Sequence, residues 1–150
     1  ASGTGGTIAG VSNALKEKKK NIKIYLSDPK GSCLYSYIKT KEFKSDGNSI
    51  TEGIGSSRVT KNFEKALIDD AYSIDDTIAL TVLFDLIEKE GLSLGTSSGI
   101  NVAGAIKLAQ ELGPNKTIVT ILCDKSDRYQ GKLFNKKFLM EKNLPYPRWL

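Results

Sequence analysis

A run of small residues near the start of the sequence, Gly3-Thr4-Gly5-Gly6-Thr7, has the composition of a phosphate-binding loop. Glycine lets several backbone N–H groups turn toward one point and lets a bulky anion approach closely. The two threonines add hydroxyl donors, and a helical pattern begins near Ile8, so a helix N-terminus adds the positive end of its dipole. Neither the dinucleotide fingerprint nor the P-loop pattern is present. On these residues alone, a phosphate-binding loop and a plain glycine-rich turn remain equally compatible with the run.

Three further segments carry small or polar residues that could contact a ligand: Gly53-Ile54-Gly55, Ser97-Ser98-Gly99 and Cys123-Asp124. Ser97 has an ordinary alternative as the N-cap of the helix that follows it. Asp124 can face a ligand pocket or cap a helix. For Cys123 we favour a small buried hydrophobic residue over a reactive thiol, and Cys33 receives no role.

Composition excludes several classes of function. The chain has no histidine, so imidazole catalysis and histidine-ligated metals are excluded and we expect no metal site. Its net charge is +5, but the lysines are scattered, and the run Lys18-Lys19-Lys20 has no interleaved aromatic residues, which favours a solvated helix end over a nucleic-acid patch. No apolar stretch is long enough to span a membrane, and no signal-peptide pattern is present. Two cysteines in unrelated contexts favour a reduced, cytoplasmic protein.

Helical and strand patterns alternate along the chain. Apolar spacing predicts long helices over residues 8–18, 77–90 and 100–112, shorter ones near 34–38 and 62, and a final helix within 127–144. Strands are predicted over residues 21–26, 68–73 and 117–122. This alternation is typical of an α/β fold with a largely parallel sheet, and 150 residues are enough for one domain. Ligands bind such sheets at the carboxyl ends of the strands, where the candidate segments fall.

In their order and spacing, these segments resemble the fold type II pyridoxal-phosphate enzymes, and within them the cysteine synthase (O-acetylserine sulfhydrylase) family. The resemblance covers essentially the whole chain, and each motif is weak alone, whereas together they are specific. The motifs are Gly3-Thr4-Gly5-Gly6-Thr7-Ile8-Ala9-Gly10, Ser27-Asp28-Pro29, Glu52-Gly53-Ile54-Gly55, Gly95-Thr96-Ser97-Ser98-Gly99 and Asp127-Arg128-Tyr129, with a closing segment over residues 132–149.

The resemblance implies a role for each matching segment. The cofactor would be pyridoxal 5′-phosphate, its phosphate held by Gly3, Thr4, Gly5, Gly6 and Thr7. The segment Gly53-Ile54-Gly55 would line the substrate side of the cofactor, and the Ser97 hydroxyl would hydrogen-bond the pyridine nitrogen. A neutral hydroxyl does not enforce protonation of that nitrogen, which suits β-elimination followed by addition of a nucleophile.

One family feature is missing from the chain. No lysine is followed by aspartate, so the Schiff-base lysine of the family, with its Lys-Asp-Arg context, has no match and we assign no catalytic residue here. We therefore expect residues 1–150 to be the C-terminal half of the enzyme, mostly its large domain, without the N-terminal half and inactive by themselves.

The resemblance also implies the activity of the complete protein. It would make L-cysteine from O-acetylserine and sulfide as a cytoplasmic homodimer, with no nucleic-acid or membrane partner. Within the same fold, cystathionine β-synthase and serine or threonine dehydratases remain alternatives. A non-catalytic, anion-binding α/β module is the alternative from another class.

Overall fold

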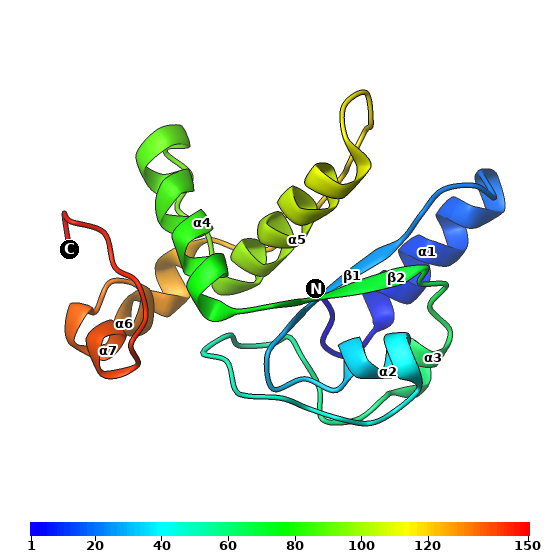
Figure 1. The fold of residues 1–150 in the computed structure, drawn as a ribbon, viewed down its shortest axis with the longest axis horizontal. Coiled ribbons are helices and arrows are strands. Elements are labelled where there is room, and N and C mark those ends of the chain that lie inside the picture. The colour runs from blue at the N-terminus through cyan, green and yellow to red at the C-terminus, as the bar shows by residue number, and fades with distance from the viewer. The chain divides into compact units, whose positions relative to one another are not determined.

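The computed structural model describes residues 1–150 and divides them into two compact units (Figure 1). The first unit comprises Ala1–Ser49 and Gly53–Ser73, and the second comprises Ile50–Glu52 and Ile74–Leu150. No helix combines the length and the hydropathy that crossing a membrane requires.

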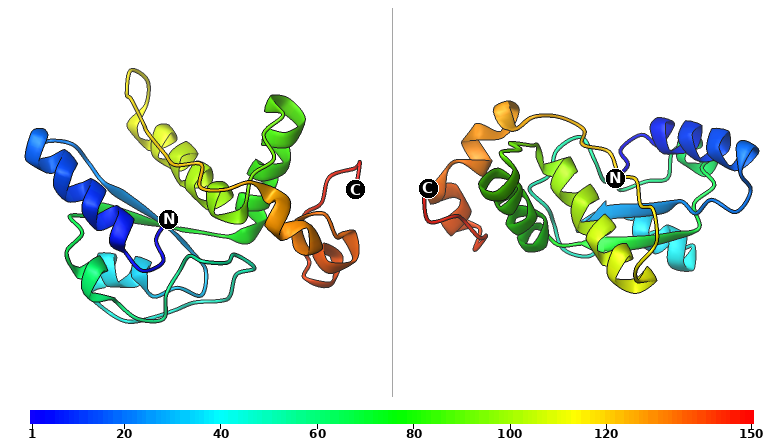
Figure 2. Two further views of the ribbon diagram at one scale, coloured as in Figure 1. Left: turned by 180° about the vertical axis from the view of Figure 1, so that it is seen from behind. Right: turned by 90° about the horizontal axis from the view of Figure 1, so that it is seen from above.

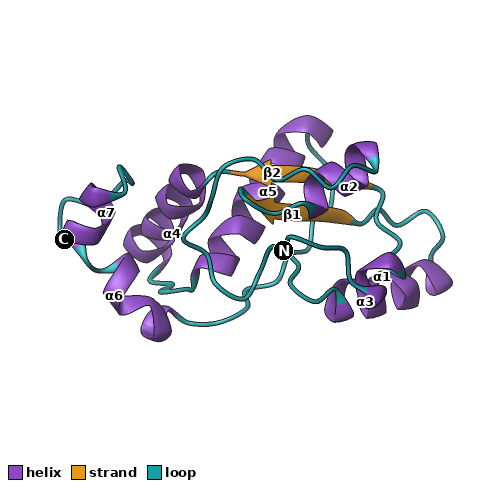
Figure 3. Cartoon of the chain, turned by 90° about the horizontal axis from the view of Figure 1, so that it is seen from below, coloured by secondary structure: helices purple, strands orange, loops and turns teal.

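The first unit is built around a two-stranded sheet. Its elements are α1 (Gly6–Lys18), β1 (Tyr25–Pro29), α2 (Leu34–Thr40), α3 (Lys61–Glu64) and β2 (Asp70–Ile74), the last residue of which belongs to the second unit. The strands β1 and β2 lie side by side and begin level with each other, since the amides of Asp69 and Asp70 both donate to the Ile24 carbonyl (Figure 3). Buried apolar residues from four elements form the core of this unit: Leu26, Cys33, Leu34, Phe63 and Ala71. This confirms the α/β class.

The strand β1 runs farther than the sequence pattern suggests. Residues 21–24 precede the strand, and it continues through Asp28 to Pro29, where proline is tolerated because it stands at the strand's end. Asp28 is fully buried, and its Oδ2 accepts a hydrogen bond from the Tyr35 amide at 2.8 Å, whereas Oδ1 has no partner. Burial outweighs the hydrogen bonds and raises the pKa of Asp28 to about 6.

The second unit is helical. Its elements are α4 (Asp76–Glu90), α5 (Thr96–Leu112), the 3₁₀ turn η1 (Ser126–Tyr129), α6 (Gln130–Leu133) and α7 (Lys136–Glu141). The helix α4 begins one residue before its predicted start and ends where predicted, because Asp75 accepts a hydrogen bond from the Thr77 amide and Gly91 ends the helix in the left-handed conformation. The core of this unit joins α4 to the C-terminal helices: Leu80, Leu83, Phe84, Leu94, Tyr129, Leu133 and Leu139.

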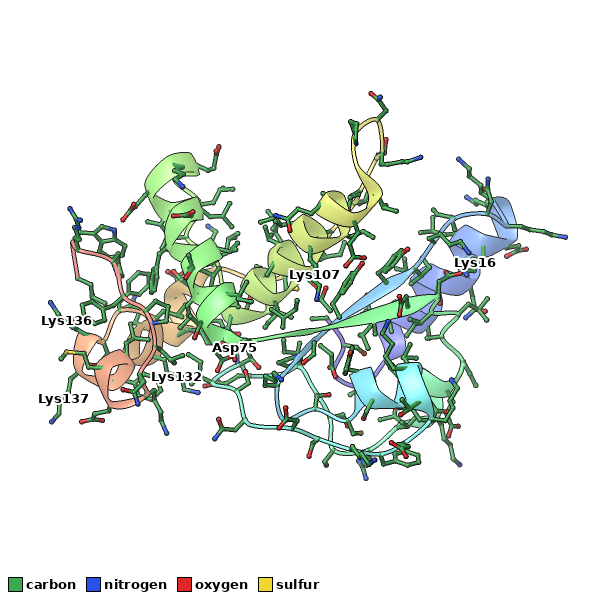
Figure 4. The ribbon with its side chains drawn as sticks, in the orientation of Figure 1. Lys16, Asp75, Lys107, Lys132, Lys136 and Lys137 are labelled. Carbon is green, nitrogen blue, oxygen red and sulfur yellow. The ribbon has the colours of Figure 1, made fainter.

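The predicted final helix is broken into three short pieces. The helical segment formed by η1 and α6, which begins at Ser126, ends before Asn135. The Asn135 side chain then caps α7 by accepting a hydrogen bond from the Phe138 amide at 3.1 Å. Lys132 on α6, labelled in Figure 4, pairs with Glu52 at 2.6 Å and donates to the Ile50 carbonyl at 3.2 Å. These contacts fasten residues 50–52 to the second unit.

The predicted strand over residues 117–122 is not formed. The segment returns from the end of α5 as a loop (Figure 2), and it is not part of the hydrogen-bonded sheet. Val119 is 82% exposed and Ile121 58%, so the apolar side chains that suggested a buried strand lie in solvent. A strand needs hydrogen-bonded partners for its backbone groups, and neither β1 nor β2 is paired with this segment.

Candidate functional site

The glycine loop leads into α1 in the way an anion site requires. Gly5 is the N-cap and has φ +83°, a left-handed conformation that glycine adopts without strain. No side chain caps the first turn of α1, and that turn has no acidic residue. The unpaired N–H groups and the helix dipole therefore remain available to a negative group.

The three glycines of this loop, Gly3, Gly5 and Gly6, differ in whether a side chain would fit beside them. A Cβ on Gly3 would lie 2.5 Å from the Gly53 carbonyl oxygen, and one on Gly5 would lie 2.6 Å from three atoms of Phe63. A Cβ on Gly6 would meet nothing within 4 Å. Gly3 and Gly5 thus allow the loop to pack, whereas Gly6 faces open space. Thr4 and Thr7 are exposed beside it.

The structure brings the second glycine segment next to this loop. The Gly55 amide donates to the Ser2 carbonyl at 2.8 Å, and Gly53 contacts Gly3 as described above. Gly53 and Gly55 both have positive φ, and Ile54 between them is half-buried. Two of the predicted site segments, far apart in sequence, therefore lie together in the first unit.

Ser97 belongs to the second unit and is not a helix cap. The N-cap of α5 is Gly95, so Ser97 is the second residue of the helix, and the capping alternative is wrong. Ser97 is buried, and its hydroxyl donates to Asp124 Oδ1 at 3.4 Å. The neighbouring Thr96 hydroxyl is buried without a partner.

Asp124 contacts Ser97 rather than capping a helix. Its Oδ2 accepts a hydrogen bond from the Tyr129 hydroxyl at 2.6 Å, a bond that raises the pKa of Tyr129, with burial acting in the same direction. The sequence alone assigns Tyr129 no function, although this residue closes the Asp127-Arg128-Tyr129 motif. Cys123 is exposed, so its interpretation as a buried hydrophobic residue is wrong.

The lysines offer no substitute for the missing Schiff-base lysine. None of them is buried, and a desolvated amine is what such chemistry needs. Lys16, for example, lies on α1 and is paired with Asp69 at 2.6 Å (Figure 4). The chain therefore presents binding groups without a nucleophilic amine of that kind.

Comparison with known proteins identifies the family. Cysteine synthase 1 of Neurospora crassa is 43% identical over 96% of this chain, and the cysteine synthase of Dictyostelium discoideum is 42% identical over 95%. The crystal structure of an O-acetylserine-dependent cystathionine β-synthase from Helicobacter pylori superposes with a TM-score of 0.76 and 35% identity over 87% of the chain. The chain spans 40% of the length of each of these proteins. The family model described as "Pyridoxal-phosphate dependent enzyme" matches residues 1–124, and the chain therefore belongs to this family.

Proposed function

We propose that this chain is the C-terminal part of a pyridoxal-phosphate enzyme that makes L-cysteine from O-acetylserine and sulfide. The observation that carries the proposal is the uncapped N-terminus of α1, with open space at Gly6, lying beside Gly53-Ile54-Gly55. The similarity to two cysteine synthases, at more than 40% identity, supports the choice of reaction.

The residues of the first unit fit the phosphate of the cofactor. Its phosphate suits the first-turn N–H groups of α1 and the hydroxyls of Thr4 and Thr7, since that turn has no side-chain cap and contains no acidic residue. Bound pyridoxal phosphate supplies an electron-withdrawing ring, which stabilises negative charge on the substrate's Cα. Ser97 would meet the ring nitrogen, and the segment Gly53-Ile54-Gly55 would line the substrate side.

The remaining parts of the proposal concern the complete protein. The Schiff-base lysine would come from a part of the protein outside this chain. We infer a cytoplasmic homodimer from the family resemblance, and the free thiols of Cys33 and Cys123 suit a reducing compartment.

The test uses the complete protein, loaded with pyridoxal phosphate and given O-acetylserine with either sulfide or homocysteine. We expect cysteine from sulfide at the higher kcat/KM. Preference for homocysteine would instead support the cystathionine β-synthase alternative, which the name of the Helicobacter pylori structure keeps open. Cofactor binding without turnover of either pair would support the non-catalytic module.

A further inference from the structure

The motif Ser27-Asp28-Pro29 has no part in the proposed function, yet the turn between β1 and α2 that follows it contacts the segment Gly53-Ile54-Gly55. A Cβ on Gly55 would lie 3.0 Å from Pro29 Cγ and 3.2 Å from Ser32 Cβ. Both distances are shorter than an ordinary van der Waals contact. The β1–α2 turn therefore packs directly on the backbone of Gly55, and a side chain there would push the two segments apart.

Hydrogen bonds fasten the end of the glycine segment to the same turn. The Ser56 amide donates to Ser32 Oγ at 3.0 Å, and the Cys33 amide donates to the Ser56 carbonyl at 2.7 Å. Both donors are backbone N–H groups, so the direction of these bonds does not depend on where the serine proton points. Ser32 is 7% exposed and Cys33 2%, so little water competes for either bond. Ser32 thus supplies a buried side-chain acceptor to the backbone of Ser56.

The core of the first unit holds the β1–α2 turn in place. Asp28 is fully buried near the end of β1, and its Oδ2 accepts a hydrogen bond from the Tyr35 amide at 2.8 Å. The Leu34 amide donates to Ser32 Oγ at 3.3 Å. Leu34 itself is fully buried. The position of Ser32 is therefore set by buried groups on both ends of the turn.

A second contact joins the glycine segment to the phosphate loop. The Gly55 amide donates to the Ser2 carbonyl at 2.8 Å, directly before Gly3. Ser2 and Ser32 therefore bind consecutive backbone amides, those of residues 55 and 56. Together they fix where Ile54 lies relative to the phosphate loop.

We propose that Ser32 is a positioning residue for the amino-acid substrate, because it holds the segment Gly53-Ile54-Gly55 in register with the phosphate loop. This inference rests on the proposed function, in which that segment lines the substrate side of the cofactor. Ser32 acts through the Ser56 amide. Loss of its oxygen should therefore weaken substrate binding and leave cofactor binding, which depends on the glycine loop before α1, unchanged.

The first test compares Ser32→Ala with Ser36→Ala in the complete protein loaded with pyridoxal phosphate. Ser36 is the matched control, because its Oγ also accepts a backbone hydrogen bond, from the Lys44 amide at 3.1 Å, but makes none to the glycine segment. In Ser32→Ala the KM for O-acetylserine should rise about two- to tenfold, the range that one neutral hydrogen bond corresponds to. The kcat and the affinity for pyridoxal phosphate should equal those of Ser36→Ala.

Hydrogen–deuterium exchange of the Ser56 amide is a readout that does not depend on activity. Exchange should be faster in Ser32→Ala, where this amide loses its acceptor, and as slow in Ser36→Ala as in the wild type. Ser32→Cys keeps the shape of the side chain but offers only a weak sulfur acceptor. It should move the KM and the exchange rate in the same directions, and it decides the question if Ser32→Ala does not fold.

The outcomes separate this inference from the proposed function. An equal KM for O-acetylserine in the Ser32 and Ser36 variants overturns the inference, while cysteine formation by the wild type leaves the proposed function standing. A loss of cofactor affinity in the Ser32 variants that matches the rise in KM also overturns it, because Ser32 would then support the whole site. A wild type that does not turn over O-acetylserine overturns the proposed function, and the inference is wrong with it.

Discussion

Gly6→Asp should weaken cofactor binding while leaving the fold as stable as before or slightly more so. Gly6 is the first residue of α1, and its built Cβ meets no atom within 4 Å. An aspartate in the first turn of a helix interacts favourably with the dipole and has a better helix propensity than glycine, which adds about 0.5–1 kcal/mol to the free energy of unfolding.

The same carboxylate should repel the phosphate. Two unit charges about 5 Å apart repel each other by about 0.8 kcal/mol in water and by about 3 kcal/mol at an effective dielectric constant of about 20. A phosphate carries close to two negative charges at neutral pH, so we expect the affinity for pyridoxal phosphate to fall at least about tenfold.

The assay compares cofactor affinity with the denaturant midpoint in the complete protein. Gly10→Asp is the matched control, because Gly10 lies on the same helix, is exposed and also has open space around its Cβ. It adds the same charge one turn farther from the helix end. Equal affinities for the two variants would show that the phosphate does not bind at the start of α1.

Three further predictions concern stability. Gly5→Ala should lower the free energy of unfolding by at least about 2 kcal/mol, since φ is +83° and the new Cβ would lie 2.6 Å from Phe63; a denaturant midpoint equal to that of Gly6→Ala would contradict this. The folded pKa of Asp28, about 6, lies above its unfolded value, so its stabilising contribution is present below about pH 4 and lost as the pH rises through 6. In the wild type, the free energy of unfolding should fall by on the order of 2–3 kcal/mol between pH 4 and pH 7 because of Asp28, and Asp28→Asn should remove this fall. The same change of unfolding free energy with pH in the variant and the wild type would refute the assignment. Burial alone would raise the pKa of Asp69, but hydrogen bonds from Lys16, the Ile24 amide and Lys23 lower it to about 2. Its contribution to stability is therefore present above about pH 4 and is lost as the pH falls through 2. Asp69→Asn should cost about 1 kcal/mol at pH 7 and less at pH 2, measured by denaturant unfolding at both pH values; an equal cost at the two would contradict the assignment.

The three long helices of this chain could be predicted because their signals are local. The periodic apolar residues of α4, its cap at Asp75 and its end at Gly91 all lie within one stretch of sequence. The segment over residues 117–122 has equally clear β-propensity but forms no strand, since pairing depends on a neighbour that its own residues cannot provide.

The candidate site likewise has one part that local sequence predicts and one part that it does not. The glycine loop could be recognised because glycine, threonine and a helix start follow one another directly. The contacts of Ser97 could not, because Asp124 is 27 residues away and reaches it only through the way the segment returns along α5. Ser97 looked like a cap for a local reason, yet Gly95 takes that position.

The exposed segment over residues 117–122 has a consequence for handling the protein. Its sequence, Thr117-Ile118-Val119-Thr120-Ile121-Leu122, contains no charge, proline or glycine and is rich in β-branched residues. Six-residue segments of this composition favour steric-zipper packing when their backbone is unpaired. When this chain is produced without a strand that covers the segment, self-association should compete with solubility. The yield of soluble chain should then fall as its concentration rises, and a charged residue in place of Val119, whose side chain lies in solvent, should restore it.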